Sequence, residues 1–288
     1  MKVTTLEEVQ RRPRRVAVGE FDGVHLGHRE VIRGSDTVLT FEPHPLAVIR
    51  PEATPKLLTS LDVKVDLVAG LGVEELIVIR FDRAFADRSA EDFVQNVLID
   101  ALDARQVSVG ENFRFGHGAR GAAAMLDARP EFTTRVVALV EVEGEVVSSS
   151  HIRGLVAAGD VAAAARFLGA PFQMRGEVVA GDRRGRELGY PTANIVPDNA
   201  YATPGHGVYA CVADERAAAV NVGVRPTFDT GRGLLVEAYL LDFDGDLYGR
   251  ELALEFLARL RGERRFDSSD ALVEQMASDV EKTRELMG

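Results

Sequence analysis

The sequence is poor in several residue types and features, and each scarcity narrows what the protein can be. Its 288 residues contain one cysteine, Cys211, and no tryptophan. A single cysteine excludes an intramolecular disulfide framework and fits a reducing compartment, so we expect a cytoplasmic protein. No apolar run approaches the length that spans a membrane. The arginine run at residues 11–15 is not followed by an apolar signal core, so we interpret it as a solvated approach to the first strand.

Basic charge is also scarce. The chain has 34 Lys and Arg against 45 Asp and Glu, which gives a net charge of −11. This balance argues against a nucleic-acid partner held by general electrostatics, although acidic enzymes bind nucleotides through local cations, amides and metal ions. The length allows two domains, and 46% hydrophobic with 27% charged residues is ordinary for a globular protein.

The most informative stretch covers residues 16–28, where a short apolar run leads through a turn into a helix. Gly19 and Gly23 bracket the turn, and His25 and His28 are spaced to share one face of the first helical turn. Such a loop presents backbone N–H groups and the positive end of a helix to a ligand. Two imidazoles beside it suit a triphosphate whose pyrophosphate leaves. A tight turn with two surface histidines is the alternative, and a zinc site is a third interpretation, although no cysteine lies nearby.

The first half of the chain alternates strand-like and helix-like segments. We expect strands at residues 16–18, 37–41, 76–79, 107–110 and 135–140, with a helix capped by Ser89 before the fourth of them. The repeating pattern from residue 15 to 168 predicts a doubly wound parallel α/β domain. In such a sheet, ligands bind at the carboxyl ends of the strands.

Three further groups follow these strands, and each has a structural alternative. His44 lies between two prolines after the strand at 37–41, where it could be only a loop residue. Asn112 and Phe113 follow the strand at 107–110 and could form a packed turn. Ser149 belongs to a hydroxyl run that leads to Arg153. Such a run commonly caps a helix, but hydroxyls with an arginine are also suited to hold phosphates.

The second half of the chain changes character near Pro171. Short strand-like runs dominate, at residues 174–179, 193–196, 208–212, 218–222, 234–241 and 252–256. Their close spacing predicts a small antiparallel barrel. Ser268 then caps a C-terminal helix whose apolar residues, Leu272, Met276 and Val280, can lie against that barrel.

A loop rich in glycine and arginine, at residues 181–189, precedes Thr192 and Asn194. Glycines let a loop wrap phosphates closely, and arginines supply positive charge. Thr192 and Asn194 lie on the same side of an extended segment, and their oxygens suit Mg²⁺ beside phosphates. A basic surface hairpin is the alternative, and Glu237 would then be an outward polar residue of its strand.

These segments together resemble the bacterial bifunctional riboflavin kinase/FAD synthetase family. Residues 19–28, GEFDGVHLGH, match its G-x-F-D-G-x-H-x-G-H signature. The blocks TFEPHP (40–45), GENFRFG (110–116) and SSSHIR (148–153) resemble three others, with Glu42 for Asp and Ser150 for Thr. GRELGYPTAN (185–194), NVGVRPTF (221–228), the strand around Glu237 and RFDS (265–268) resemble kinase blocks. The family usually has a longer helix between the first two blocks.

The resemblance implies an FMN adenylyltransferase of the nucleotidylyltransferase type at residues 1–169 and a riboflavin kinase barrel with a terminal helix at 170–288. It implies that His25 and His28 are catalytic in adenylylation and that Glu237 is the base for the flavin 5′-hydroxyl. Implied nucleotide or phosphate contacts are Gly19, Phe21, Asp22, Gly27, Ser149, Arg153, Gly181, Gly185 and Arg186. Implied flavin contacts are His44, Asn112, Phe113, Arg225, Thr227 and Arg265, and implied Mg²⁺ ligands are Thr192 and Asn194.

The expected function is therefore phosphorylation of riboflavin to FMN with ATP and Mg²⁺, followed by adenylylation of FMN to FAD. Small molecules, namely riboflavin, FMN and ATP, are the expected partners. One alternative is a kinase alone, whose shortened first domain has lost adenylylation. The other is a non-catalytic flavin-sensing module, against which the intact His25, His28, Thr192, Asn194 and Glu237 argue.

Overall fold

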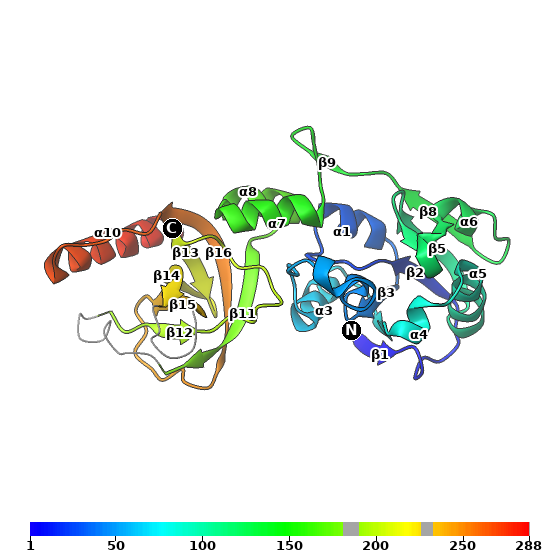
Figure 1. Ribbon diagram of the computed structural model, residues 1–288, viewed down its shortest axis with the longest axis horizontal. Helices are drawn as coiled ribbons and strands as arrows, with labels where there is room; N and C mark the ends of the chain where they lie inside the picture. The colour runs from blue at the N-terminus through cyan, green and yellow to red at the C-terminus, as the bar shows by residue number, and fades with distance from the viewer. Residues whose placement is uncertain (181–189, 226–232, 288) are drawn as a thin grey trace. The chain divides into compact units, whose positions relative to one another are not determined.

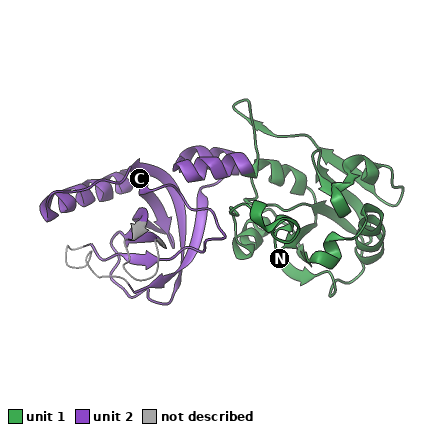
Figure 2. Ribbon diagram, viewed as in Figure 1, with its two compact units in different colours: residues 1–149 green, residues 150–288 purple. Residues whose placement is uncertain are grey.

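The computed structural model describes residues 1–180, 190–225 and 233–287. The chain divides into two compact units, Met1–Ser149 and Ser150–Gly288, which are coloured separately in Figure 2. Unit 1 is an α/β unit on a parallel sheet, and unit 2 is built around a closed antiparallel barrel. The predicted fold class is confirmed in both halves.

Unit 1 is built on a six-stranded sheet in the order β1-β4-β3-β2-β5-β8 (Figure 1). All neighbouring strands run parallel. The strands are β1 Lys2–Thr5, β2 Arg14–Val18, β3 Thr37–Glu42, β4 Glu75–Arg80, β5 Ala104–Gly110 and β8 Thr133–Val137. β1 was not predicted, and β8 ends at Val137 rather than at residue 140. The reason is that its partner β5 ends at Gly110, which pairs with Val137.

Short helices connect these strands. They are α1 Leu26–Ile32, α2 Pro45–Ile49, α3 Leu61–Ala69, α4 Arg83–Ala86, α5 Ala90–Asp92, the π-helical η2 Phe93–Ala101 and α6 Ala123–Asp127, with 3₁₀ turns η1 Pro51–Ala53 and η3 His117–Ala119. Two short hairpins, β6 Arg114–Phe115 with β7 Gly121–Ala122 and β9 Glu141–Val142 with β10 Glu145–Val146, complete the unit. The predicted cap is confirmed, since Ser89 Oγ accepts from the Asp92 N–H at 3.0 Å.

Both faces of the parallel sheet are covered by apolar layers. Along β2, Val16 and Val18 belong to one core cluster, whereas Ala17 between them belongs to the other. The first cluster includes residues of η2 and α6, and the second includes residues of α1 and α3. Because successive side chains of a strand point to opposite faces, this division places helices on both sides of the sheet. This arrangement confirms the prediction of a doubly wound α/β domain.

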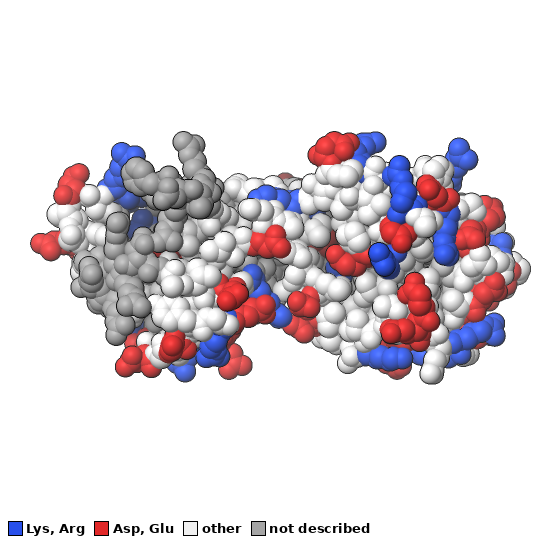
Figure 3. Space-filling view, turned by 60° about the horizontal axis from the view of Figure 1, so that its bottom comes forward, with Lys and Arg blue, Asp and Glu red and all other residues white. Residues whose placement is uncertain are grey.

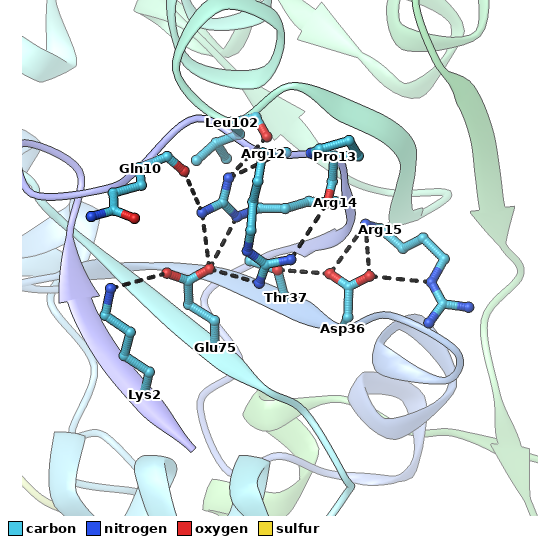
Figure 4. Close-up of polar contacts among 10 residues, drawn as sticks. All are labelled: Lys2, Gln10, Arg12, Pro13, Arg14, Arg15, Asp36, Thr37, Glu75 and Leu102. Carbon is cyan, nitrogen blue, oxygen red and sulfur yellow. Dashed lines mark hydrogen bonds and ion pairs between the residues drawn. The ribbon is translucent and has the colours of Figure 1, made fainter.

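The arginine run before β2 is not simply solvated, so that prediction is wrong for Arg14. Its side chain is 1% exposed, at the amino edge of the sheet (Figure 4). Nε donates to Glu75 Oε2 at 3.0 Å, and the other nitrogens donate to the carbonyls of Leu102, Gln10 and Arg12. A buried guanidinium is tolerated because a carboxylate and these carbonyls satisfy its donors. The cluster is structural and lies at the edge opposite to the carboxyl ends of the strands.

Unit 2 contains a closed barrel in the order β11-β12-β15-β14-β13-β16. Its strands are β11 Phe172–Val179, β12 Ala193–Ile195, β13 Gly207–Ala213, β14 Arg216–Arg225, β15 Gly233–Leu240 and β16 Glu251–Arg261. All six strand-like runs of the sequence are confirmed, and each paired edge is antiparallel. α10 Ser269–Met287 follows Ser268, whose Oγ accepts from the Ala271 N–H at 3.2 Å, and this helix packs on β13 and β14.

Two helices, α7 Ser149–Ala158 and α8 Val161–Leu168, precede the barrel and are held to it. α8 packs against β11 and β16. At the end of α7, Arg259 donates to the Ala158 carbonyl at 3.4 Å, and the Gly205 N–H donates to the Val156 carbonyl at 3.0 Å. These bonds join the carbonyl end of α7 to β16 and to the segment before β13. The compact units divide after Ser149, the first residue of α7, whereas the predicted division between residues 169 and 170 falls after α8.

The surface carries charge of both signs. On the face drawn in Figure 3, Lys and Arg side chains are interspersed with Asp and Glu over the described surface of each unit. Mixed charge of this kind is the ordinary pattern of a globular protein surface.

Candidate active sites

Three of the sequence blocks follow adjacent strands at the carboxyl edge of the parallel sheet. β2 leads into the loop that carries residues 19–25, β3 leads to His44, and β5 leads to Asn112 and Phe113. β3, β2 and β5 are neighbours in the sheet and run parallel, so their following loops emerge side by side. This edge is where ligands bind in open α/β sheets.

His25 and His28 stack face to face at the start of α1. Their ring centroids are 3.5 Å apart and their planes differ by 15°. His25 is the N-cap of α1, and its Nδ1 accepts a hydrogen bond from the His28 backbone N–H at 3.2 Å. A ring nitrogen that accepts carries no proton, so a neutral His25 has its proton on Nε2. The helix cap therefore fixes the tautomer that presents an Nε2–H donor, as a phosphate oxygen requires.

His28 is neutral in these surroundings. Burial lowers the pKa of His28 well below its ordinary value, and the adjacent His25 and the Lys64 ammonium lower it further. Its Nδ1 is buried and has no hydrogen-bond partner, and the Phe21 ring meets the imidazole edge-on at 5.4 Å. A bound phosphate would supply the negative charge and the acceptor that the imidazole lacks.

The loop between β2 and α1 is tightly turned. Phe21 and Val24 have φ values of +51° and +40°, a region that residues other than glycine rarely adopt. At Gly19 a Cβ atom would lie 3.1 Å from Cζ of Phe21, and at Gly27 it would lie 3.2 Å from Cε1 of His25. The two glycines therefore allow the Phe21 and His25 rings to pack closely against the backbone.

Asp22 and Ser149, both predicted to contact the nucleotide, hold this loop in place. The buried Asp22 carboxylate accepts from the backbone N–H groups of Leu58 at 2.7 Å and Thr59 at 3.2 Å through Oδ1. Ser149 Oγ donates to the Asp22 carbonyl at 2.9 Å. The structure thus links the glycine-rich loop to the segment before α3 and to Ser149, the last residue of unit 1.

The remaining residues predicted for the first site differ in their exposure and in the contacts they make. His44 caps α2, with Nδ1 accepting from the Leu46 N–H at 3.1 Å, so a neutral ring again carries its proton on Nε2. Asn112 is exposed, and Phe113 stacks on Phe115 with ring centroids 5.5 Å apart. Arg153 lies on α7 in unit 2, where it donates to Ser150 Oγ at 3.1 Å.

A row of polar side chains crosses three adjacent strands of the barrel. Glu237 of β15 pairs with Asn194 of β12 on one side and with Asn221 of β14 on the other. Directly opposed residues point to the same face of a sheet. The neighbours of Glu237 along the strand, Val236 and Ala238, are fully buried, so the row lies on the face turned away from the barrel interior. Asn221 Nδ2 donates to Glu237 Oε2 at 3.3 Å, which orients the carboxylate.

The residues beside this row fit a magnesium ion. Thr192 precedes β12 by one residue and lies on the same side of the chain as Asn194, which is 7% exposed. Mg²⁺ takes hard oxygen ligands, keeps several waters and draws its remaining ligands from substrate phosphates. Among the described residues, no group of three or more His, Cys, Asp or Glu is arranged to hold a metal ion. Within that part of the chain, the zinc interpretation of His25 and His28 therefore has no third His, Cys, Asp or Glu ligand.

The other residues predicted for the kinase site lie outside the described residues or near the ends of described segments. Gly181, Gly185, Arg186 and Thr227 lie outside the described residues. Arg225 is the last residue of β14, where its backbone pairs with Gly233 of β15. Arg265 is exposed in the segment between β16 and α10.

Sequence reasoning missed three residues that the structure brings to these sites. Asn221 opens the NVGVRPTF block, and its position one strand away from Glu237 appears only once the strands are paired. Glu20 belongs to the glycine-rich loop, and Lys64 lies beneath it. Lys64 sits in α3, where a lysine on a short helix is expected to be solvated, and no local pattern indicates that it is buried.

Comparisons with known proteins agree with this division into two sites. A family model described as FAD synthetase matches residues 7–151, and one described as riboflavin kinase matches residues 168–287. Curated relatives are the bifunctional riboflavin kinase/FMN adenylyltransferases of Listeria monocytogenes, Bacillus subtilis and Escherichia coli K12. The Listeria protein is 35% identical over 93% of this chain and 91% of its own length. The corresponding values are 34%, 93% and 90% for the Bacillus protein, and 36%, 95% and 92% for the Escherichia protein.

A solved structure is similar along the whole chain. It comes from Streptococcus pneumoniae, is described as a macrolide-efflux protein, and matches with a TM-score of 0.89 and 31% identity over 99% of both chains. Within the described parts of the present chain, no helix has the length and apolar character needed to cross a membrane. The two family models, one in each half of the chain, and the curated relatives, which align over nearly its full length, identify the family. The chain belongs to the bifunctional riboflavin kinase/FMN adenylyltransferase family.

Proposed function

We propose that this protein makes FAD from riboflavin in two steps. Unit 2 phosphorylates riboflavin with ATP to give FMN, and unit 1 adenylylates FMN with a second ATP and releases pyrophosphate. The observation that supports this proposal is that each unit contains its own cluster of polar side chains suited to phosphate chemistry. Unit 1 has the stacked His25–His28 pair, and unit 2 has the Asn194–Glu237–Asn221 row. Phosphoryl transfer requires mainly positioning and charge neutralisation, which both sets of residues supply.

In the kinase step, Glu237 accepts the proton of the riboflavin 5′-hydroxyl as that oxygen attacks the γ-phosphorus of ATP. The bond from the γ-phosphorus to the bridging oxygen breaks, and ADP leaves. Asn221 holds the accepting carboxylate in one orientation through its hydrogen bond to Oε2. Thr192 and Asn194 would hold Mg²⁺, which neutralises phosphate charge when bound.

In the adenylylation step, a phosphate oxygen of FMN attacks the α-phosphorus of ATP, and the bond to the β-phosphate oxygen breaks. Negative charge grows on the departing pyrophosphate and on the oxygens of the α-phosphorus. Nε2–H of His25 and the imidazole of His28 donate hydrogen bonds there, and the N-terminus of α1 adds backbone N–H groups. His44 and Asn112, on the neighbouring loops, line the flavin side of the site.

The composition of the chain also bears on its cellular location and on the type of partner it binds. The single cysteine, Cys211, cannot form an intramolecular disulfide, which supports a cytoplasmic location. The net charge of −11 supports small-molecule substrates rather than a nucleic acid.

One assay tests the proposed function against its alternatives. The protein is incubated with riboflavin, ATP and Mg²⁺, and FMN and FAD are separated by chromatography over time. We expect FMN to appear first and FAD to follow. If riboflavin is converted to FMN but no FAD forms, even from added FMN, the protein is a riboflavin kinase only. If the protein binds riboflavin but forms neither FMN nor FAD, it is a non-catalytic flavin-sensing module.

A further inference from the structure

A lysine is buried beneath the glycine-rich loop of unit 1. Lys64 is 5% exposed, and its Nζ donates to the Glu20 carbonyl at 2.8 Å and to Thr40 Oγ1 at 3.4 Å. Thr40 Oγ1 donates to the same Glu20 carbonyl at 3.1 Å. Lysine is almost never fully buried unless it is paired, because removing an ammonium group from water is costly. The position of Lys64 therefore calls for a reason other than packing.

The loop above Lys64 is held through its carbonyl groups. Lys64 and Thr40 bind the Glu20 carbonyl, Ser149 binds that of Asp22, and Arg29 Nε donates to that of Val24 at 3.1 Å. A trans peptide places its C=O and N–H on opposite sides. Fixing the Glu20 carbonyl toward Lys64 therefore fixes the Phe21 N–H on the other side of that peptide.

These bonds act on a loop that would otherwise relax. Phe21 and Val24 both have positive φ, and residues in such conformations persist only where the surrounding structure determines them. The Glu20 carbonyl lies immediately before Phe21, so the Lys64 bond fixes the chain where the first of these conformations begins. Loss of that bond would release the turn that sets the position of His25.

The charge of Lys64 also affects two titratable groups, Glu20 of the loop and His28 of α1. His28 faces His25 and Lys64, and both lower its pKa in addition to burial. Glu20 faces Lys64, Asp22 and Glu42. Burial raises the pKa of the Glu20 carboxyl to about 8, the Lys64 charge opposes that rise, and the two acidic neighbours add to it. Removing the ammonium group would therefore raise the pKa of both His28 and Glu20.

We propose that Lys64 is a positioning residue for adenylyl transfer, fixing the Glu20 carbonyl, and through it the loop that leads to His25, and placing a positive charge behind His28. The inference rests on the proposed adenylylation at this edge of the sheet. Lys64 acts through the loop and the histidine, not on the substrate.

The test compares substitutions in the full-length protein, with FMN and ATP supplied for FAD formation. Lys64→Met keeps the apolar stem and removes the ammonium group. We expect kcat/KM for FAD formation to fall on the order of 10- to 100-fold, the effect of losing a charge-assisted hydrogen bond that organises a site. The limb of the pH–rate profile that reports His28 should move to higher pH. Lys64→Arg keeps a charged donor and should recover part of the activity without moving that limb.

Controls separate this role from simple loss of folding. Lys56→Met makes the same change at an exposed lysine of the preceding segment and should leave both activities unchanged. Riboflavin phosphorylation by unit 2 reports the enzyme concentration, and thermal unfolding reports the folding of unit 1. The proposal is overturned if Lys64→Met keeps kcat/KM for FAD formation within about twofold of wild type, or if its pH profile does not move.

If Lys64→Met does not fold, Thr40→Val decides the matter. It removes one of the two side-chain donors to the Glu20 carbonyl and leaves the ammonium group in place. A fall in FAD formation with unchanged riboflavin phosphorylation supports the proposal, and wild-type FAD formation overturns it. A wild-type protein that makes no FAD from FMN would instead contradict the proposed adenylylation itself.

Discussion

His25 and His28 are joined twice, by rings stacked with centroids 3.5 Å apart and by a 3.2 Å hydrogen bond from the His28 backbone N–H to His25 Nδ1. His25 therefore serves both as the cap of α1 and as a donor at the carboxyl edge of the sheet. Substitution can separate these two roles, because asparagine is among the best helix caps but has no imidazole.

We first predict that His25→Asn keeps the stability of unit 1 but lowers FAD formation. The expected loss in kcat is on the order of 100-fold, as for the removal of one donor to a developing oxyanion. The double change of His25 and His28 to Ala should abolish FAD formation while FMN still accumulates from riboflavin. Chromatography of the flavins measures both outcomes. Undiminished FAD from the double variant would remove the histidines from the mechanism.

A second prediction concerns where unit 2 begins. A fragment of residues 150–288 keeps α8, whose Phe167 is 3% exposed and which packs on β11 and β16. A fragment of residues 170–288 loses that cover. Burying one large apolar side chain is worth roughly 1.5–3 kcal/mol, so the longer fragment should unfold at a clearly higher temperature.

Both fragments should phosphorylate riboflavin when folded, since the Asn194–Glu237–Asn221 row lies wholly within the barrel. Thermal unfolding and a riboflavin kinase assay measure the two properties. Equal unfolding temperatures would show that α7 and α8 do not stabilise the barrel, and the division near Pro171 would then stand.

A third prediction concerns the buried carboxyl of Glu20. Burial raises the pKa of Glu20 from 4.5 to about 8, so the folded protein binds this proton more tightly than the unfolded chain does. The stability that comes from this proton is fully present below pH 4.5 and is lost as the pH rises towards 8. A pKa difference of one corresponds to about 1.4 kcal/mol, so the loss amounts to a few kcal/mol at most.

Glu20→Gln cannot ionise and should lose this pH dependence. We expect its stability relative to wild type to increase steadily between about pH 5 and pH 8 and then to level off. Urea unfolding across that range measures the difference. A difference that stays constant with pH would mean that Glu20 is ionised in the folded protein throughout.

The spacing of apolar runs and turn residues in the sequence predicts most of the strands, because these signals are local. Short apolar runs between turn residues are local features, so all six barrel strands and five of the six strands of the sheet could be located. The burial of Arg14 and Lys64 was not predicted, because their partners, Glu75 and Glu20, lie far away along the chain. Asn221 and Glu237 likewise become neighbours only through strand register, which is a property of the folded barrel.

The division of the chain into compact units also depends on contacts between distant residues. Pro171 and the change in composition mark the start of the barrel strands, and these are local signals. Arg259 and Gly205, which hold the end of α7, follow that helix by many residues. Long-range contacts of this kind decide which unit a connecting helix belongs to, and composition does not reveal them.

The last prediction concerns the base of the kinase step. Glu237 is centred in a polar row, with Asn194 paired on one side and Asn221 donating to Oε2 on the other. A primary hydroxyl is a poor nucleophile until its proton has an acceptor, and a positioned carboxylate contributes on the order of 10²- to 10⁴-fold. Glutamine keeps the size and the hydrogen-bonding reach of glutamate but cannot take the proton.

We therefore expect Glu237→Gln to lower kcat for riboflavin phosphorylation by about 10²- to 10⁴-fold while riboflavin affinity changes little. Glu251→Gln, an exposed change on β16 of the same barrel, should leave kcat unchanged and serves as the matched control. FMN supplied to either variant should still become FAD at the wild-type rate, because the histidine pair lies in unit 1. Steady-state kinetics with separated flavins measure all three. Near wild-type kcat in Glu237→Gln would mean that Asn194 and Asn221 flank a barrel residue with no part in the chemistry, and that another group takes the proton.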